Sequence, residues 1–487
     1  MHEIVHKKPL SASQPRHGLA VELGQTAKLA WPMALTQLAQ VAMMATDLAF
    51  IGRIGPEALA AAALGVTLYI ISCTFGAGLL APIGPLTAQA IGAANFAVVP
   101  RALRMGLWLA LFLSVPIIAI AVRGEQILLA LGQGPDAARL AQQYLLGLAW
   151  GVVPALWLHA IRNFMAAAGR PEPILWITLA AIPVNAVLVY LLVFGKFGLP
   201  RLELFGVGLG STLVNCGTFL AAVCVATMCR PFRDYRVLAH VWRFDRLFMR
   251  QMIVIGTPIS IALVMQYGVF AAGALLAGRI GTSALAAHQI AMQVATILYT
   301  VPLGISMAAA VRVGHAVGRK DGPSIKRAGL AAIVLGFLIA ALLTIGVVAA
   351  RFQIAELFLD KSAADADATI GLATTLLLVT AGFFAADATQ IIAAGGLRGL
   401  KDTRMPLLFA VLAYWLIGFS FSYAFGLMMG LGAIGIWIGL SVGSATYAGL
   451  LVIRFQLLAT RFSVLAPPPD RVNHRYSTGT NSQTRAT

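Results

Sequence analysis

Two acidic side chains lie deep inside long apolar segments, where a charge is costly. Of the 18 Asp and Glu residues, only Asp47 and Asp387 are far from the polar breaks and ends of these segments. A carboxylate at the centre of a membrane-spanning helix costs at least about 2.5 kcal/mol on insertion scales, and such residues usually face cavities and serve ion or substrate pathways. We therefore expect Asp47 and Asp387 to act in such a pathway.

Charge balance for these two acids has to come from outside the chain. We expect no Lys or Arg to be available inside the membrane to pair with either acid, which leaves a proton, a metal cation or a cationic substrate to neutralise each carboxylate. Removal from water favours the protonated or cation-bound form of a carboxylate. A competing cation can then displace the first, and this predicts the exchange of one cation for another.

One face of the first apolar segment carries polar side chains. Gln37, Gln40, Met44 and Asp47 follow one another at intervals of 3, 4 and 3 residues, which places them on one side of a helix. We expect this side to face a cavity, with Gln40 and Asp47 taking part in cation coupling.

Neutral oxygen donors from two later segments are candidates to complete a cation shell around Asp47. They are Asn185, Thr212 and Asn215. Hard cations take oxygen ligands, so Asp47 and Asn185 are the expected ligands if the cation is Na+. Ordinary hydrogen bonding between helices is the alternative role for these neutral residues.

A similar stripe surrounds the second acid. Thr380, Phe384, Asp387 and Gln390 share one face of a helix. Phe384 offers an aromatic face to a bound organic cation. We expect Phe384, Asp387 and Gln390 to bind the substrate.

The composition places these residues in a membrane. Charged residues make up 11% of the 487-residue chain and hydrophobic residues 59%, whereas a soluble domain carries about 25% charged residues. Runs long enough to cross a bilayer, about 20 residues each, predict an all-α membrane protein with twelve transmembrane helices. The runs lie near 27–51, 58–82, 102–122, 138–162, 174–195, 205–228, 250–277, 286–310, 328–350, 368–395, 406–428 and 432–457.

The positive charge predicts the orientation. The formal charge of +17 comes from Lys and Arg in short loops and tails, without an RNA-binding signature, so we expect no nucleic-acid partner. The positive-inside rule predicts a bacterial inner-membrane protein with both termini in the cytoplasm. We expect a cytoplasmic segment at 1–26, a six-helix lobe at 27–228, a cytoplasmic basic linker at 229–249, a second six-helix lobe at 250–457 and a disordered cytoplasmic tail at 458–487.

The two lobes share an internal repeat. GRIGPEALAA at 52–61 and GRIGTSALAA at 278–287 agree at eight of ten positions, at an offset of 226. The same offset pairs Pro32 with Pro258, Gln40 with Gln266, and Gly92 with Gly318. Six helices separate the copies, so both have the same orientation, and we expect a parallel pseudo-two-fold relation of the two lobes.

Several segments resemble the multidrug and toxic compound extrusion (MATE) family, NorM-type branch, over about 25–457. They are the stretch from Pro32 to Asp47 followed by GRIG, FGAGLLAPIGPLTAQAIGA at 75–93, IPVN at 182–185, VFGKFG at 193–198, AAHQIA at 286–291, RVGHAVGRKD at 312–321 and DATQIIAAGGLRGLKDTRMP at 387–406. The resemblance implies a two-lobe, twelve-helix fold that expels cationic, often aromatic drugs and dyes in exchange for Na+ or H+.

The resemblance also implies roles for single residues. Asp47 is similar to the amino-lobe ion-site acid, with Asn185 as a ligand, and Asp387 is similar to the carboxy-lobe acid. Similar transporters often have a Glu where this sequence has Gln266, so a carboxy-lobe Na+ site like theirs is not expected. We expect Gln266, together with its neighbour Tyr267, to line the substrate site as a neutral residue.

These observations predict a secondary active multidrug efflux transporter that works by alternating access and has no enzymatic activity. We expect its partners to be small cationic drugs and dyes and the lipid bilayer. We expect Na+ or H+ as the coupling ion, no cofactor, and a monomeric protein. A flippase for a lipid-linked precursor, from the same superfamily, is the alternative, but its anionic cargo calls for basic cavity residues, and we expect none there. A membrane enzyme is a more distant alternative, because two separate acids do not assemble a catalytic site.

Overall fold

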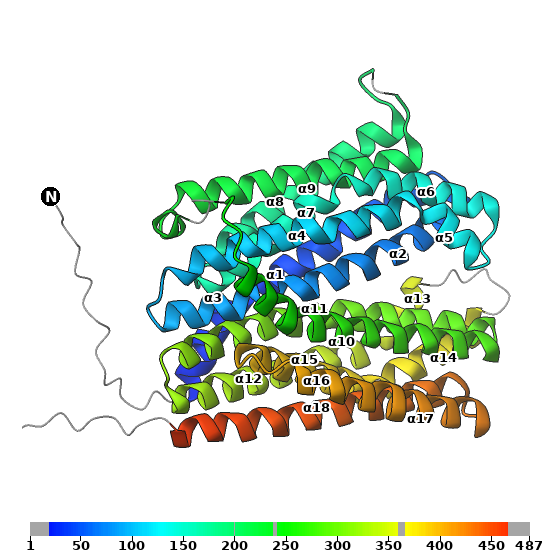
Figure 1. The fold of residues 1–487 in the computed structure, drawn as a ribbon. Coiled ribbons are helices and arrows are strands. Elements are labelled where there is room, and N and C mark those ends of the chain that lie inside the picture. Colours follow the sequence, from blue (N-terminus) through cyan, green and yellow to red (C-terminus); the bar gives the residue numbers. More distant parts are fainter. Residues whose placement is uncertain (1–18, 199, 237–240, 359–365, 466–487) are drawn as a thin grey trace, which may run out of the picture.

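The computed structural model describes residues 19–198, 200–236, 241–358 and 366–465, and every regular element in this part of the chain is helical. The helices form two lobes that lie one above the other in Figure 1. Ten helices or helix pairs in the described residues are long and apolar enough to cross a membrane, and two further bent pairs raise the number to twelve. The expected all-α fold with twelve transmembrane helices is confirmed.

The amino lobe contains nine helices that make six spans. They are α1 (Leu19–Gly52), α2 (Pro56–Leu80), α3 (Ile83–Gly92), α4 (Val98–Val122), α5 (Gly124–Ala130), α6 (Pro135–Ala149), α7 (Val152–Ala167), α8 (Glu172–Phe194) and α9 (Glu203–Met228). A short turn of 3-10 helix, η1 (Phe232–Tyr235), follows in the linker.

The carboxy lobe repeats this plan. Its helices are α10 (Arg246–Ile280), α11 (Thr282–Gly318), α12 (Gly322–Ala349), α13 (Arg351–Phe358), α14 (Ala366–Val379), α15 (Ala381–Gly399), α16 (Arg404–Ala410), η2 (Val411–Phe419), α17 (Ser420–Tyr423), η3 (Ala424–Met428) and α18 (Gly432–Leu465). The stretches η2 and η3 are π-helical and continue the span that α16 begins.

The fourth span of each lobe is broken at the same place. The chain bends by 52° between α6 and α7 and by 46° between α14 and α15. Asp387 lies in the second turn of α15, just after the break at Thr380. The bend at this break therefore determines how the helix face that carries Asp387 is oriented in the lobe.

Several helices continue further than the apolar runs predict. α7 reaches Ala167 and α15 reaches Gly399, while α18 continues to Leu465. The expected disordered tail is therefore wrong for residues 458–465, and 466–487 lie outside the described residues. A helix satisfies its own backbone groups and can continue through the polar interface, so apolar runs underestimate its length. α1 also begins within the expected segment 1–26, of which 1–18 are not described.

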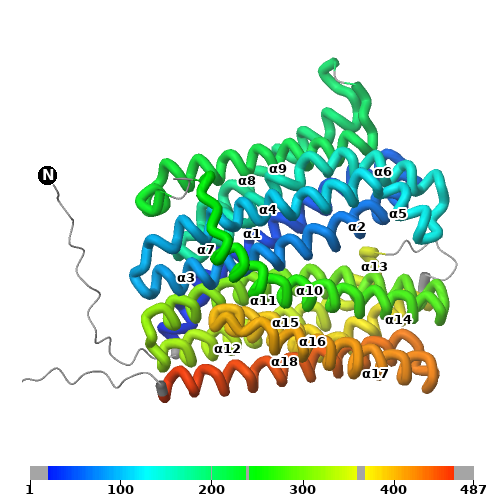
Figure 2. The backbone as a smooth tube through the Cα atoms, in the orientation of Figure 1, coloured from blue at the N-terminus to red at the C-terminus, as the bar shows by residue number. Residues whose placement is uncertain are grey.

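The internal repeat appears as paired contacts between the lobes. A Cβ at Gly92 would lie 2.3 Å from the carbonyl oxygen of His315, and a Cβ at Gly318 would lie 2.2 Å from that of Gln89. The offset of 226 converts the first contact into the second. The pseudo-two-fold symmetry therefore relates the two sides of the contact between α3 and α11. These helices pack together and can be followed in Figure 2. Only glycine permits so close an approach.

Polar contacts fasten the lobes at this end of the molecule. Arg312 of α11 forms an ion pair with Glu22 in the first turn of α1, and Arg327 of α12 approaches the same carboxylate at 3.9 Å. Gln89 Nε2 of α3 donates to the carbonyl oxygen of Gly399 at 2.8 Å. We call this set of contacts, together with the Gly92 and Gly318 pair, the inter-lobe seam.

Candidate functional site

The carboxylate of Asp47 is surrounded by neutral donors from two neighbouring helices. Asn185 Nδ2 of α8 donates to one oxygen at 2.6 Å, and Ser211 Oγ of α9 donates to the other at 2.9 Å. The amide oxygen of Asn185 is buried and has no hydrogen-bond partner among the described residues. The carboxylate and the Ser211 hydroxyl are hard oxygens of the kind that a small cation takes. The Asn185 amide turns its nitrogen to the carboxylate in this structure, so it would have to turn over to add its oxygen to such a site.

Two residues expected at this site point elsewhere. Thr212 Oγ1 donates to the carbonyl oxygen of Gly147 at 2.7 Å, between α9 and α6. Gln40 accepts a hydrogen bond from Arg162 at 3.1 Å. One residue along a helix turns a side chain by about 100°, so Ser211 reaches Asp47 while its neighbour Thr212 does not. The sequence shows two adjacent hydroxyl residues, and only the rotation of α9 about its axis decides that Ser211, and not Thr212, faces Asp47.

A partly buried arginine lies on α7 of the amino lobe. Arg162 of α7 donates to the amide oxygens of Gln37 and Gln40 at 3.0 and 3.1 Å, and to Nδ1 of His159 at 2.6 Å. The expectation that no Arg is available inside the membrane is therefore wrong for Arg162, although this arginine pairs with neither Asp47 nor Asp387 among the described residues. The apolar run ends at 162, but α7 continues past this residue, so the guanidinium remains inside the lobe. Its terminal nitrogens bind neutral oxygens and a ring nitrogen, while its Nε has no hydrogen-bond partner in the described part of the chain.

Asp387 is the centre of the carboxy-lobe site. Its side chain is buried on α15, with 6% of the residue exposed. Gln390 Nε2 donates to Asp387 Oδ1 from one turn further along the helix, and Gln266 Nε2 of α10 approaches the same oxygen at 3.4 Å. No ion pair of Asp387 or of Asp47 occurs among the residues that the structure describes.

A cavity of about 80 Å³ opens beside Asp387. Its lining is aromatic and polar, and consists of Gln266, Tyr267, Phe270, Met292, Ala295, Thr296, Tyr299, Phe383 and Asp387. We call it the Asp387 cavity. Phe383 contributes the ring that faces it, while Phe384, expected in that role, lines a cavity of only about 10 Å³ on another side of Asp387. The expected grouping of Tyr267 and Gln266 with Asp387 is present, because all three line this cavity.

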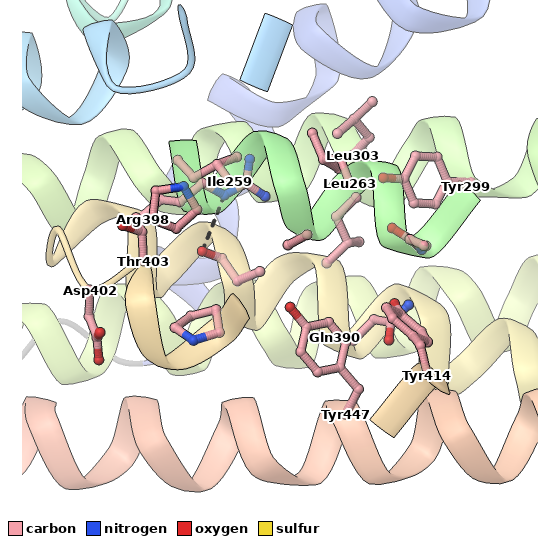
Figure 3. A pocket seen from close by; sticks show the side chains of 16 residues that line it. Ile259, Leu263, Tyr299, Leu303, Gln390, Arg398, Asp402, Thr403, Tyr414 and Tyr447 are labelled. Atoms are coloured by element: carbon pink, nitrogen blue, oxygen red, sulfur yellow. Dashed lines mark hydrogen bonds between the residues drawn. The ribbon is translucent and has the colours of Figure 1, made fainter. Parts of the chain in front are cut away.

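A second cavity of about 110 Å³ adjoins the first. It is lined by Pro258, Ile259, Ala262, Leu263, Gln266, Tyr299, Leu303, Gln390, Ile391, Ala394, Arg398, Asp402, Thr403, Pro406, Tyr414 and Tyr447. We call it the Arg398 cavity, and Figure 3 shows its side chains. Arg398 escaped the sequence analysis because the apolar run ends at 395, whereas α15 continues to Gly399. Its spacing from Asp387 and Gln390 on one helix face could have identified it.

The paired lobes, the buried acids and the cavities define a two-lobed, multi-pass membrane transporter. The family model named MatE matches residues 32–191 and 258–424, one segment in each lobe. The chain therefore belongs to the MatE family.

Individual relatives agree with this assignment. The chain is 55% identical over 456 residues to the "Probable multidrug resistance protein NorM" of Bradyrhizobium diazoefficiens, covering 94% of this chain and 97% of the relative. It is 53% identical to the protein of the same name from Rhodopseudomonas palustris, covering 90% of this chain and 92% of the relative.

Solved structures show the same fold. The eukaryotic MATE transporter AtDTX14 superposes with a TM-score of 0.81 at 18% identity, covering 92% of this chain and 99% of that chain. An outward-facing multidrug resistance MATE family transporter gives 0.82 at 20% identity, covering 93% of this chain and 100% of that chain.

Proposed function

We propose that this protein is a secondary active multidrug efflux transporter of the bacterial inner membrane, with both termini in the cytoplasm. It exports organic, often aromatic cations in exchange for Na+ or H+ by alternating access. One observation carries the proposal: each lobe holds a carboxylate, partly buried at Asp47 and buried at Asp387, that receives hydrogen bonds from neutral side chains and forms no ion pair among the described residues. A buried carboxylate of this kind needs a cation or a proton.

The two carboxylates suit two different cations. The carboxylate of Asp47 and the Ser211 hydroxyl beside it are hard oxygens that fit a coupling ion, whereas Asp387 borders a cavity lined by Phe270, Tyr299 and Phe383. Aromatic faces attract organic cations. We propose that the amino lobe couples the ion and that the carboxy lobe binds the drug. Two lobes related by a parallel repeat can rock about sites of this kind.

Transport in proteoliposomes tests the proposal. Liposomes with purified protein and a fluorescent organic cation are exposed to a Na+ gradient and, separately, to a pH gradient. We expect one gradient to drive dye across the membrane, with no coupled transport for Asp47→Asn. Asp136→Asn, at an exposed acid in the first turn of α6, should behave as wild type. Equal dye movement with and without either gradient would refute antiport.

A flippase for a lipid-linked precursor is the second candidate. Its anionic cargo requires basic cavity residues, and Arg162 and Arg398 are such residues. The buried acids Asp47 and Asp387 oppose it, because they would repel an anionic headgroup. Dye export without movement of a labelled lipid-linked sugar between leaflets would exclude the flippase.

A further inference from the structure

We propose that the Arg398 cavity is an anion subsite, which takes the carboxylate of a substrate whose cationic end is held at Asp387. The inference rests on the proposed function and concerns where the protein would hold a substrate that has an ammonium group at one end and a carboxylate at the other.

The charge of the cavity is the first argument. Arg398 Nε donates to the carbonyl oxygen of Ala394 at 3.3 Å, and a terminal nitrogen donates to Ser306 Oγ at 3.2 Å. No carboxylate pairs with Arg398 in the described part of the chain. The acid that lines the same cavity, Asp402, is already paired with Arg454 at 2.8 Å. The guanidinium therefore leaves the cavity with an uncompensated positive charge.

Unsatisfied polar atoms are the second argument. The hydroxyl of Tyr414 and the amide oxygen of Gln390 both belong to residues that line the cavity. The two side chains interact with each other, but neither atom makes a hydrogen bond of good geometry among the described residues. These residues are 3% and 1% exposed. A buried polar group without a partner destabilises the folded protein. A polar ligand group that displaces or joins water in the cavity would recover part of this cost, and the Tyr414 hydroxyl can donate to a carboxylate.

The helix that carries both charges supplies the third argument. Asp387 and Arg398 are separated by 11 residues, or three turns, so they lie on one face of α15. At 1.5 Å per residue their backbones are about 16 Å apart, too far for an ion pair between them. The Asp387 and Arg398 cavities share Gln266 and Tyr299 in their linings. An elongated molecule with opposite charges at its ends would match both.

The closest competing explanation is structural. A guanidinium near the end of α15 can also interact favourably with the helix dipole, and this role needs no ligand. The two roles differ in one respect, because a structural arginine affects all substrates equally.

A matched pair of probes tests the subsite. The zwitterionic probe is an aromatic amine that carries a carboxylate, and the cationic probe is its methyl ester. Dissociation constants are measured by fluorescence on purified protein in nanodiscs, for wild type, Arg398→Gln, Tyr414→Phe and Asp387→Asn. Arg404→Gln is the control, because Arg404 is an exposed arginine at the start of α16, outside both cavities.

We expect Arg398→Gln to weaken binding of the zwitterion at least about tenfold, since a hydrogen bond to a charged group contributes about 1.5–3 kcal/mol, and to leave the ester within about twofold. Tyr414→Phe, which removes one hydroxyl, should weaken only the zwitterion, and this remains informative if Arg398→Gln does not fold. Asp387→Asn should weaken both probes.

The other outcomes overturn the subsite. Equal weakening of both probes by Arg398→Gln, or no change in either, would assign Arg398 a structural role and leave the proposed export of cations intact. Binding of neither probe by wild-type protein would contradict the proposed function as well.

Discussion

At the scale of single residues, the two acids differ in what surrounds them. Asp47 receives hydrogen bonds from an amide and a hydroxyl, next to an unpaired amide oxygen of Asn185. Asp387 receives its bonds from the amide nitrogens of Gln390 and Gln266. Asp47 therefore has a hydroxyl among its partners, whereas both partners of Asp387 are amides. In the proposed function, the hydroxyl helps Asp47 to hold a small cation, and the cavity beside Asp387 takes a larger one.

A pair of neighbouring hydroxyls on α9 tests the first arrangement. Ser211→Ala removes an oxygen from Asp47, so we expect several-fold weaker activation of dye export by the coupling ion, with an unchanged melting temperature. Thr212→Ala removes a buried bond to Gly147, so it should cost about 1 kcal/mol of stability and leave ion activation unchanged. Ion titrations of transport and thermal unfolding in detergent measure both effects. Identical behaviour of the two variants would contradict the assignment of Ser211.

A comparison of Asp47→Asn with Asp387→Asn tests the division of labour between the lobes. The offset of 226 places Gly273 opposite Asp47 and Ile161 opposite Asp387, so neither acid has a copy in the other lobe. We expect Asp387→Asn to reduce dye affinity more than it reduces the ion-induced change in tryptophan fluorescence. Asp47→Asn should have the opposite pattern. Equal loss of the fluorescence response in both variants would show that both acids bind the ion.

At the scale of the helices, glycine determines how closely elements of the carboxy lobe pack. Gly439 of α18 lies against α17, where a Cβ would come within 2.2 Å of the backbone nitrogen of Ser422. The Ser422 hydroxyl in turn donates to the carbonyl oxygen of Ile436 at 2.9 Å. This contact holds the π-helical span, which carries Tyr414, against α18.

Two glycines of the same helix therefore provide a matched test. Gly439→Ala should lower stability by about 1–3 kcal/mol, because overpacking forces the backbones apart. Gly449→Ala, where nothing lies within 4 Å of the added Cβ, should be neutral or slightly stabilising because alanine favours a helix. Thermal unfolding in detergent measures both. A stable Gly439→Ala variant would show that α17 moves easily away from α18.

At the scale of the whole molecule, the inter-lobe seam joins the lobes at the end where α1 begins. It combines the paired glycine contacts of α3 and α11 with the ion pair between Arg312 and Glu22. In the alternating access that we propose, the lobes separate at each end in turn, and this seam would break once in every transport cycle. Its ion pair is partly buried.

Glu22→Gln tests the role of the seam. Loss of one partner of a buried ion pair is destabilising, so we expect the form that is open at this end to be more populated. Hydrogen exchange of backbone amides at the start of α1 and the end of α11 should become several-fold faster. Glu57→Gln, at an exposed acid in the first turn of α2, is the control. Unchanged exchange in Glu22→Gln would show that glycine packing alone holds the seam.

The sequence by itself determined the membrane class, the twelve spans, the repeat and the two buried acids. These features are local, because hydrophobicity over about 20 residues decides whether a helix enters the bilayer, and an acid within such a run is visible without a structure. The repeat also indicated that Gly92 and Gly318 correspond, as their paired contacts in the structure bear out.

Only the tertiary structure decided which side chains meet. In the structure Ser211, and not Thr212, contacts Asp47. Phe383, and not Phe384, lines the Asp387 cavity. Arg162 and Arg398 lie inside the lobes. In each case the outcome depends on the rotation of a helix about its axis or on where the helix ends. Both are set by packing against other helices, and one residue of rotation, about 100°, is enough to turn a side chain from one neighbour to another.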